Sequence, residues 1–493
     1  MAPPDDHPCY WRDEAERLAA ELHTERERLA AEAAERAAEV EELKRKLAGL
    51  ERRLGRHKSE KMPAMAGEVA KKRPPDREVA RQKRRDAAAA KAKLATEVEP
   101  VPVPPAGRTC PCCGNERLKT VGEGTPSAII EYVPGYFRRR VRLRETLACS
   151  CGDYIVTAPA PGDESLYAPS FVAYLIVSKC EDGLPFYRLA KMLSRTGIPV
   201  VRSTLNDLFH RAAMRLAPLA ARILERIKLA PIVFADETSI KMLEGNTRAY
   251  VWTFLAEELI GFDFSADRSG ETPERVLGDS TGELVVDMYT GYNAITVPGR
   301  RRRAGCLAHA RRKVFEAKDV PGAVEALEII RDIYVVEHDA RERGIGGTDD
   351  HLQLRQERSR PLMARLLVWA RATRRVHVPK SPLGRAAGYI IRNRRALTRF
   401  LHVAALPPDN NRSEAALRRV ALGRKNYLFV GNEDSGKNTA GLFSIVASCV
   451  HHDIDPLEYL TDVLVRVDTH PSSRIDELLP DKWRPPEPAP TPA

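Results

Sequence analysis

Residues 231–240 read "PIVFADETSI", an apolar run typical of a buried strand that leads directly into two acids, Asp236 and Glu237. An ionised carboxylate is costly to bury unless it is paired or bound to a metal ion. The strand therefore either reaches the surface here or carries acids that hold a cation. The same pattern returns in "LVVDMYTGYN", where a second apolar run ends at Asp287.

The segments around these acids predict a sheet. Four stretches read as strands, and the short helix "TPERVLG" forms a crossover before the last of them. The strands are "APIVFADETSI", "RAYVWTFLAE", "LIGFDFSADRS" and "GELVVDMYTGYN". Acids on two strands lie side by side if the strands are neighbours. In a regular strand, Glu237 points to the opposite face from Asp236, so we expect replacement of Glu237 by Gln to cost far less activity.

A third acid, Glu414, lies in "PPDNNRSEAALRRVALGRKNYLF" at 407–429. Asn411, followed three residues later by Glu414, is typical of a helix N-terminal box, and Gly423 is a suitable C-terminal cap. The local pattern alone explains Glu414 as a capping residue and needs no metal.

The length and charge of the chain indicate several domains and a polyanionic partner. It has 493 residues, with 79 Lys and Arg against 68 Asp and Glu and a net charge of +11, which favours nucleic acid. No stretch approaches the roughly 18 uninterrupted apolar residues that span a bilayer, and the N-terminus lacks the apolar core of a signal peptide. We therefore expect no membrane contact and a cytoplasmic, nucleoid-associated location.

The N-terminal region predicts a coiled coil and a basic linker. Leucines recur at intervals of seven within 11–56, so we expect self-association through a coiled coil, with a single solvated helix as the alternative. Residues 57–105 lose this period, and Lys71 to Lys93 holds ten basic and three acidic residues. This arm either binds phosphates or only keeps the chain soluble.

Cysteines predict a zinc ribbon at 106–160. Five of the nine cysteines lie between "CPCCG" at 110–114 and "CSCG" at 149–152, which fits a metal site better than a disulfide framework. Thiolates from two such knuckles can close a tetrahedron around Zn²⁺. The expected ligands are Cys110, Cys113, Cys149 and Cys151, with Cys112 as a possible substitute.

Residues 168–228 are helical by pattern. One helix is followed by a break at Gly197-Ile198-Pro199 and by a second helix with Ser203 as its expected N-cap. This arrangement resembles a helix-turn-helix, whose second helix enters the major groove, although a Gly turn between helices is common in any α-domain.

Several motifs together resemble one family, the transposases of the insertion-sequence sixty-six family. The matching stretches include "GRHKSEKMP", the cysteine knuckles, "FADET", "VVDMYTGYN", "GCLAHARRKVFEA", "LRQERSRPL", "PKSPLGRAAGYI", "DNNRSEAALRRVALGRKNYLFVG" and "RIDELLPDKW". They occur in the usual order and cover about Leu43 to Trp483.

The resemblance implies a ribonuclease-H-like catalytic domain at 229–445 with a helical insertion at about 318–400, followed by a C-terminal segment at 446–493. It implies that Asp236, Asp287 and Glu414 hold two divalent ions, Mg²⁺ or Mn²⁺, for in-line cleavage of DNA and strand transfer. The expected partners are the inverted repeats at the element's ends, target DNA, further copies of the chain, and small accessory proteins of the same element.

The stretch "CLAHARRK" adds a further candidate site. Cys306-x-x-His309 resembles a motif that supports the active site or the DNA end in several ribonuclease-H-like transposases; zinc binding and an ordinary buried Cys and His are the alternatives. The surrounding basic residues are expected to contact phosphates. They are Arg300 to Arg303, Arg311, Arg312, Lys313, Arg424 and Lys425.

The fold class expected from these features is multidomain α+β, in the order coiled coil, zinc ribbon, helix-turn-helix and ribonuclease-H-like α/β domain. The leading functional hypothesis is a DDE-type DNA transposase. One alternative is a ribonuclease-H-like nuclease that cuts without joining strands. The other is a DNA-binding regulator whose catalytic domain is only a scaffold.

Overall fold

The computed structural model describes most of the chain from residue 167 onward. The described residues are 167–427, 429–485, 146–148, 155–157 and single positions at 17, 20, 24, 28, 81, 82, 85 and 137. The chain divides into two compact units, Met1–Ile130 and Glu131–Ala493. The expected coiled coil, basic linker and zinc ligands lie outside the described residues, apart from single helical positions within 17–28 and 81–85.

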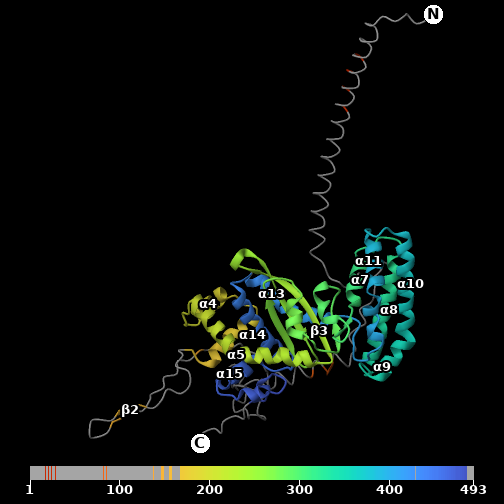
Figure 1. The fold of residues 1–493 in the computed structure, drawn as a ribbon. Coiled ribbons are helices and arrows are strands. Elements are labelled where there is room, and N and C mark those ends of the chain that lie inside the picture. Colours follow the sequence, from red (N-terminus) through yellow and green to blue (C-terminus); the bar gives the residue numbers. More distant parts are fainter. Residues whose placement is uncertain are drawn as a thin grey trace, which may run out of the picture. The chain divides into compact units, whose positions relative to one another are not determined.

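A mixed sheet forms the centre of the second unit (Figure 1). Its strands are β3 (Ile232–Met242), β4 (Arg248–Leu255), β5 (Ile260–Ser265), β6 (Glu283–Val285), β7 (Arg302–Ala304) and β8 (Phe429–Val430). The strand order is β5-β4-β3-β6-β7, and β8 pairs with β3. β3, β4 and β5 are antiparallel, whereas β6 runs parallel to β3 and β7 runs parallel to β6. The four strands and the crossover helix expected from the sequence, α6 (Glu271–Leu277), are all present.

The length of β3 explains its central place in the sheet. Its first half pairs with β6, in the register Phe234↔Val285, and its last residues pair with β8. The aromatic and aliphatic residues of β3, β4 and β5 are almost fully buried; Trp252 and Phe254, for example, have no exposed surface. Burial of such side chains stabilises each by about 1.5–3 kcal/mol, so the sheet is a rigid platform for the acids that follow its strands.

Three helices precede the sheet. They are α3 (Pro169–Cys180), α4 (Phe186–Arg195) and α5 (Arg202–Leu229). The break between α4 and α5 contains Gly197, which adopts a positive φ of 83°. Ser203 is not the N-cap, because α5 begins at Arg202 after Val201. Before them, β1 (Thr146–Ala148) and β2 (Ile155–Thr157) form an antiparallel pair.

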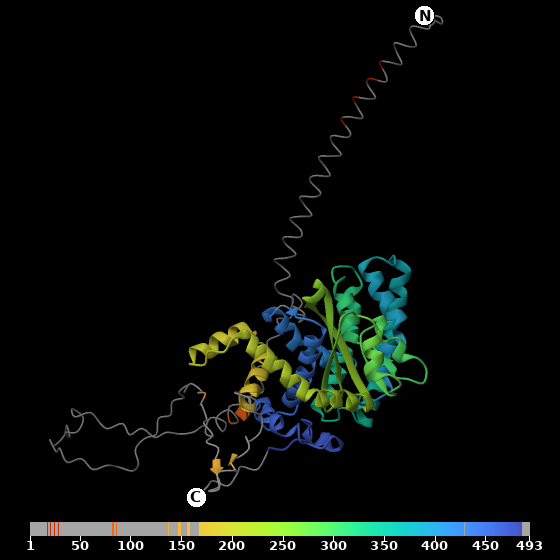
Figure 2. The same cartoon turned by 60° about the vertical axis from the view of Figure 1, so that its left-hand side comes forward.

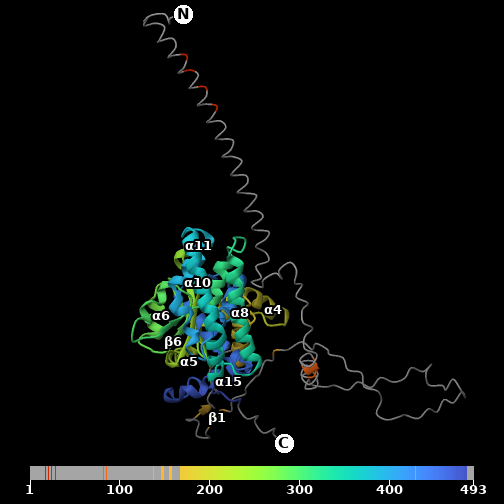
Figure 3. The ribbon, with the colours of Figure 1, turned by 90° about the vertical axis from the view of Figure 1, so that its right-hand side faces the viewer.

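A group of helices lies between β7 and the last part of the sheet domain, within the insertion expected at 318–400. Its members are α8 (Ala323–Glu342), α9 (Asp349–Leu354), a π-helical turn (Arg355–Ser359), α10 (Arg360–Val376), α11 (Pro382–Arg392) and α12 (Arg394–Leu397). Helices α8, α10 and α11 stand together beside the sheet in Figure 1, and α8 and α10 face the viewer in Figure 3. The almost fully buried Arg355 ties this group together, because it pairs with Glu337 and donates to three carbonyl oxygens of residues 400–404.

The C-terminal helices pack on the other side. They are α13 (Asn411–Tyr427), α14 (Glu433–His451), α15 (Pro456–Arg466) and a 3₁₀ turn (Ser472–Leu478). Helix α13 contacts β3 and β4, and α14 contacts β5 and α5. Figure 2 shows the sheet between these helices, in blue, and the green-to-cyan helices of residues 307–392. Helix α14 runs unbroken across residues 445 and 446, where we expected the catalytic domain to end.

Two local expectations for α13 are wrong. Asn411 is the first residue of the helix rather than its cap, and its N–H donates to Asp409 Oδ1 at 3.1 Å. Gly423 does not end the helix, which continues to Tyr427. Both signals are local, whereas the start of the helix is held by a side-chain hydrogen bond from Asn410 to β3.

Within the described part of the chain, no helix is both long and apolar enough to cross a membrane.

Candidate active site

The parallel pairing of β3 with β6 determines where Asp236 and Asp287 lie relative to each other. The register between β3 and β6 runs from Ile232↔Glu283 to Phe234↔Val285. Continuing it by two residues places Asp236 beside Asp287. The backbone turns after β6, where Tyr289 N–H donates to Asp287 Oδ1 at 2.8 Å. Asp236 therefore lies on β3, and Asp287 follows the neighbouring strand β6 by two residues.

Glu414 reaches the same region from α13. The side chain of Asn410, which precedes the helix, donates from Nδ2 to the carbonyl oxygen of Ala235 at 2.9 Å. Because Ala235 directly precedes Asp236, this bond anchors the start of α13 next to the acid on β3. The same face of β3 meets α13 again at Phe234, whose ring lies 4.8 Å from the Arg412 guanidinium. Glu414 thus lies in the first turn of a helix held against β3.

The electrostatics of Asp236 reflect this convergence. Burial is the largest cause that raises its pKa to about 7, and the charges of Glu237, Asp287 and Glu414 raise it further, while a hydrogen bond from Glu237 N–H at 2.9 Å acts in the opposite direction. Burial and the neighbouring negative charges therefore both disfavour the ionised form of Asp236. Hard carboxylate oxygens in such a place suit a divalent cation such as Mg²⁺ or Mn²⁺.

Glu237 has different surroundings from Asp236. Its carboxylate accepts hydrogen bonds from Tyr292 OH at 2.7 Å and from Arg268 Nε at 2.9 Å, and its side chain is only 2% exposed. Arg268 in turn lies 4.0 Å from the centre of the Tyr289 ring. Asp236 faces α13 and Glu237 faces this aromatic cluster, as strand alternation predicts. Glu237 therefore does not point into solvent. It is a buried acid that is paired with Arg268 and accepts a hydrogen bond from Tyr292.

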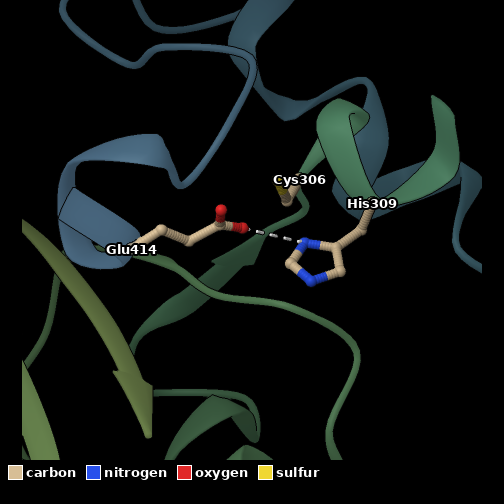
Figure 4. A group of neighbouring side chains, drawn as sticks. All are labelled: Cys306, His309 and Glu414. Atoms are coloured by element: carbon tan, nitrogen blue, oxygen red, sulfur yellow. Dashed lines mark ion pairs between the residues drawn. The ribbon is translucent and has the colours of Figure 1, made fainter. Parts of the chain in front are cut away.

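Cys306 and His309 lie close to Glu414 (Figure 4). Cys306 directly precedes α7 (Leu307–Phe315), and His309 is in its first turn. The Nδ1 atom of His309 is 3.8 Å from Glu414 Oε1. Among the described residues, these three form the one group of His, Cys, Asp or Glu whose ligand atoms all lie within 4.8 Å of one another. Asp236 and Asp287 do not join Glu414 in so compact a group.

The basic residues predicted to bind phosphates divide into two sets. Arg312 and Lys313 are exposed on α7, and Arg312 Nη2 lies 3.8 Å from Glu414 Oε2. Arg311 is half-buried on the same helix, and Lys425 is exposed on α13. These four are available at the surface or its edge.

The members of the second set contact other groups of the protein, and their role in binding phosphate stays a prediction. Arg424 donates to Thr238 Oγ1 at 3.3 Å and to the Ser239 carbonyl oxygen. Arg301 is 1% exposed and donates to the backbone of Lys228, Ala230 and Glu283. Arg300 pairs with Glu274 and Asp279, and Arg302 pairs with Glu283. Arg303 differs from these, because its Nε and Nη2 are buried without a hydrogen-bond partner.

Comparison with known sequence families covers most of the chain. The model described as "Transposase IS66 family" matches residues 164–438, more than half of the 493 residues. The chain belongs to the IS66 family of transposases. The family resemblance seen in the sequence motifs is thereby confirmed. Two further IS66 models match, "IS66 C-terminal element" at 444–480 and "zinc-finger binding domain of transposase IS66" at 108–152.

The zinc-finger match covers all four expected ligands, Cys110, Cys113, Cys149 and Cys151, and indicates Zn²⁺ as a cofactor of this IS66 protein. These cysteines are outside the described residues. Strand β1 ends at Ala148, directly before Cys149, and β2 begins after Cys151. The second knuckle therefore belongs to the connection between two paired strands.

Similar proteins occur in Sinorhizobium fredii (strain NBRC 101917 / NGR234). "Uncharacterized protein y4jD" is 33% identical over 410 residues, which cover 78% of this chain and 79% of the relative. "Uncharacterized protein y4qI" is 30% identical over 403 residues, which cover 76% of this chain and 74% of the relative. "Uncharacterized protein y4hP" is 29% identical over 411 residues, which cover 76% and 73%.

Sequence reasoning missed several residues that shape the site. Asn410, which anchors α13 to β3, was not singled out from the sequence. Tyr292 and Arg268, which hold Glu237, lie near the ends of two segments that were predicted as strands. Nothing in the local pattern of Arg268 indicates its partner.

Proposed function

We propose that this IS66 protein binds the ends of its insertion sequence, cleaves the DNA and transfers the strands to target DNA, using a ribonuclease-H-like domain. The observation that carries the proposal is the convergence of Asp236, Asp287 and Glu414 from β3, the end of β6 and the start of α13. The strand order β5-β4-β3-β6-β7, with its first three strands antiparallel and the last two parallel to β3, supports the fold assignment.

The residues present fit two divalent cations. Asp236, Asp287 and Glu414 would hold them, and the burial of Asp236 beside the negative charges of Glu237, Asp287 and Glu414, which together raise its pKa to about 7, supports that fit. Bound there, the ions supply Lewis-acid activation for an in-line displacement at phosphorus. The chain's own contribution is positional, because the pairing of β3 with β6 and the Asn410 anchor bring together the elements that carry the three carboxylates.

Other parts of the chain are assigned to DNA. The exposed Arg312, Lys313 and Lys425 and the half-buried Arg311 contact phosphates near the acids. The ribbon at 106–160, helices α4 and α5 within 168–228, and the basic linker at 57–105 bind the element's ends. The coiled coil at 11–56 joins copies of the chain, so that two ends can be held together. In the cell the protein acts at the nucleoid, with small accessory proteins of the same element as further partners.

The test is Mg²⁺-dependent cleavage of a duplex that carries an element end. Asp236→Asn, Asp287→Asn and Glu414→Gln each remove a ligand charge with little change in volume, and we expect each to lower cleavage by about 10³-fold or more while DNA binding persists. Glu271→Gln is the matched control, because Glu271 is an exposed acid on α6. Wild-type cleavage by Asp287→Asn would refute the assignment.

The same assay separates the two alternatives. Cleavage without joining of a labelled end to target DNA would identify a nuclease. Tight, metal-independent end binding by a wild-type protein that does not cleave would identify a regulator.

A further inference from the structure

We propose that Cys306, His309 and Glu414 form a binding site for a transition-metal ion such as Zn²⁺, separate from the zinc ribbon. The three ligand atoms lie within 4.8 Å of one another. Figure 4 shows the side chains of His309 and Glu414 extending toward each other, with Cys306 beside them.

The atoms that face each other lack other partners. His309 Nδ1 and Glu414 Oε1 are both buried and have no hydrogen-bond partner. Their separation of 3.8 Å is too long for a hydrogen bond between them. A buried donor or acceptor without a partner costs about 1–3 kcal/mol, so two such atoms aimed at one point indicate that something binds between them.

The spacing suits a tetrahedral ion. Zinc bonds of about 2.0–2.1 Å to nitrogen and 2.0–2.2 Å to carboxylate oxygen place those two atoms about 3.4 Å apart. The observed 3.8 Å between His309 Nδ1 and Glu414 Oε1 needs only a small side-chain adjustment to reach that value. A carboxylate on a helix and an imidazole on α7 can both make this adjustment by rotation about their side-chain bonds.

The chemistry of the donors selects the metal. A thiolate and an imidazole are soft and intermediate ligands that suit Zn²⁺ or Co²⁺, whereas Mg²⁺ prefers oxygen alone. One thiolate, one neutral imidazole and one carboxylate would neutralise a divalent ion. Three protein ligands also leave a fourth position open, as in zinc sites that exchange a ligand.

The backbone holds the ligands in place before any ion binds. The N–H of Asn410 donates to Cys306 Sγ at 3.3 Å, a bond that also stabilises a thiolate. On either side of Cys306, Gly305 N–H donates to the Ala396 carbonyl oxygen and Leu307 N–H to that of Pro408, both at 2.9 Å. Cys306 is therefore fixed between α12 and the start of α13, and His309 follows three residues later on a helix.

Glu414 belongs to both sites, and this consequence rests on the proposed function. An ion held by Cys306 and His309 keeps Glu414 on the α7 side and away from Asp236 and Asp287. Transition-metal binding would thus oppose assembly of the magnesium site. The existence of the Cys306 site does not depend on that competition.

The experiment is a count of bound metal in the full-length protein. The chain is loaded with Zn²⁺, dialysed, and its zinc content measured by elemental mass spectrometry. We expect Cys306→Ser and His309→Gln each to hold one zinc ion per chain fewer than wild type. Cys449→Ser is the matched control, because Cys449 is also a fully buried thiol but lies on α14. It should retain the wild-type content.

Two further measurements keep the result decisive. Cys110→Ser should lose a different ion, so its loss and that of Cys306→Ser should add in the double variant. In protein loaded with Co²⁺, Cys306→Ser should lose part of the thiolate-to-cobalt absorption. If Cys306→Ser melts early, His309→Gln decides, because the His309 side chain is partly exposed. Wild-type zinc content in folded His309→Gln would overturn the proposal, and loss of DNA cleavage alone would not bear on it.

Discussion

Two adjacent residues, Asp236 and Glu237, show how much the surroundings decide what a carboxylate does. Asp236 faces Glu414 and Asp287 without a cation, whereas Glu237 is held by Arg268 and Tyr292. Burial raises the pKa of Glu237, and its two hydrogen-bond partners lower it again. The first arrangement suits a metal ligand, and the second suits a structural ion pair.

This difference predicts a stability effect for Glu237→Gln. Removing the charge weakens the pair with Arg268, whose side chain is 44% exposed and therefore partly rehydrated, so we expect a loss of about 1–2 kcal/mol in the free energy of unfolding. Cleavage should still fall far less than in Asp236→Asn. The effect is measured by thermal melting of Glu237→Gln, with Glu271→Gln as the control. An unchanged melting temperature in Glu237→Gln would show that the ion pair with Arg268 does not contribute to stability.

Single residues were also where sequence reasoning was least secure. The acids at the ends of apolar runs could be predicted, because burial of a charge is a local signal of function. The internal hydrogen bonds of Arg301 and Arg424 could not be predicted. The local sequence around a basic residue is the same whether its side chain binds phosphate or a carbonyl oxygen of a distant segment. The local pattern also favoured Glu414 as a cap, and only the family resemblance indicated otherwise.

At the scale of elements, the strands and the crossover helix were predictable from hydrophobic period, whereas the helical insertion was expected only from the family resemblance. The ends of α13 were not, because Asn410 bonds to β3 and the helix continues past Gly423 toward β8. Helix ends depend on such long-range contacts, which short motifs do not encode. The same limit explains why Ser203 does not cap α5.

Lys179 at the end of α3 joins several of these elements. Its Nζ lies 3.8 Å from the centre of the Tyr427 ring on α13 and 4.6 Å from that of Phe186 on α4. Burial is the main cause that lowers its pKa to about 8 from 10.5. Attraction to the rings acts the other way and partly offsets the burial cost.

The lowered pKa predicts a pH-dependent stability difference. Between pH 8 and 10.5 the unfolded chain binds a proton at Lys179 that the native protein does not, so this residue's contribution to stability rises with pH. We expect Lys179→Met to be more stable than wild type by about 1–3 kcal/mol at pH 7, and the gap to narrow toward pH 10.5. Denaturant unfolding across this range tests it, and a less stable variant at pH 7 would show that the ring contacts outweigh burial.

At the scale of the whole molecule, the positive charge is unevenly distributed. The segment Lys71 to Lys93 holds ten basic against three acidic residues, which is most of the chain's net charge of +11. In the described part of the chain, by contrast, Arg301 and Arg355 are almost fully buried and donate to backbone carbonyl oxygens. Cations committed in this way cannot release counterions from DNA.

The last prediction follows from that distribution. Each phosphate contact contributes about −0.9 to the slope of log affinity against log salt concentration, so replacing residues 71–93 with a Gly/Ser segment of equal length should flatten the slope by several units. Equal length preserves the spacing between the coiled coil and the ribbon, and folding of the later domains should be unaffected. Titration of a labelled duplex at four salt concentrations measures the slope, and Lys313→Ala is the control, because losing one surface contact should change it by about one. If the replaced chain has the same slope as wild type, residues 71–93 do not contact DNA and only keep the chain soluble. The DNA contacts would then lie on α7, the ribbon and helices α4 and α5.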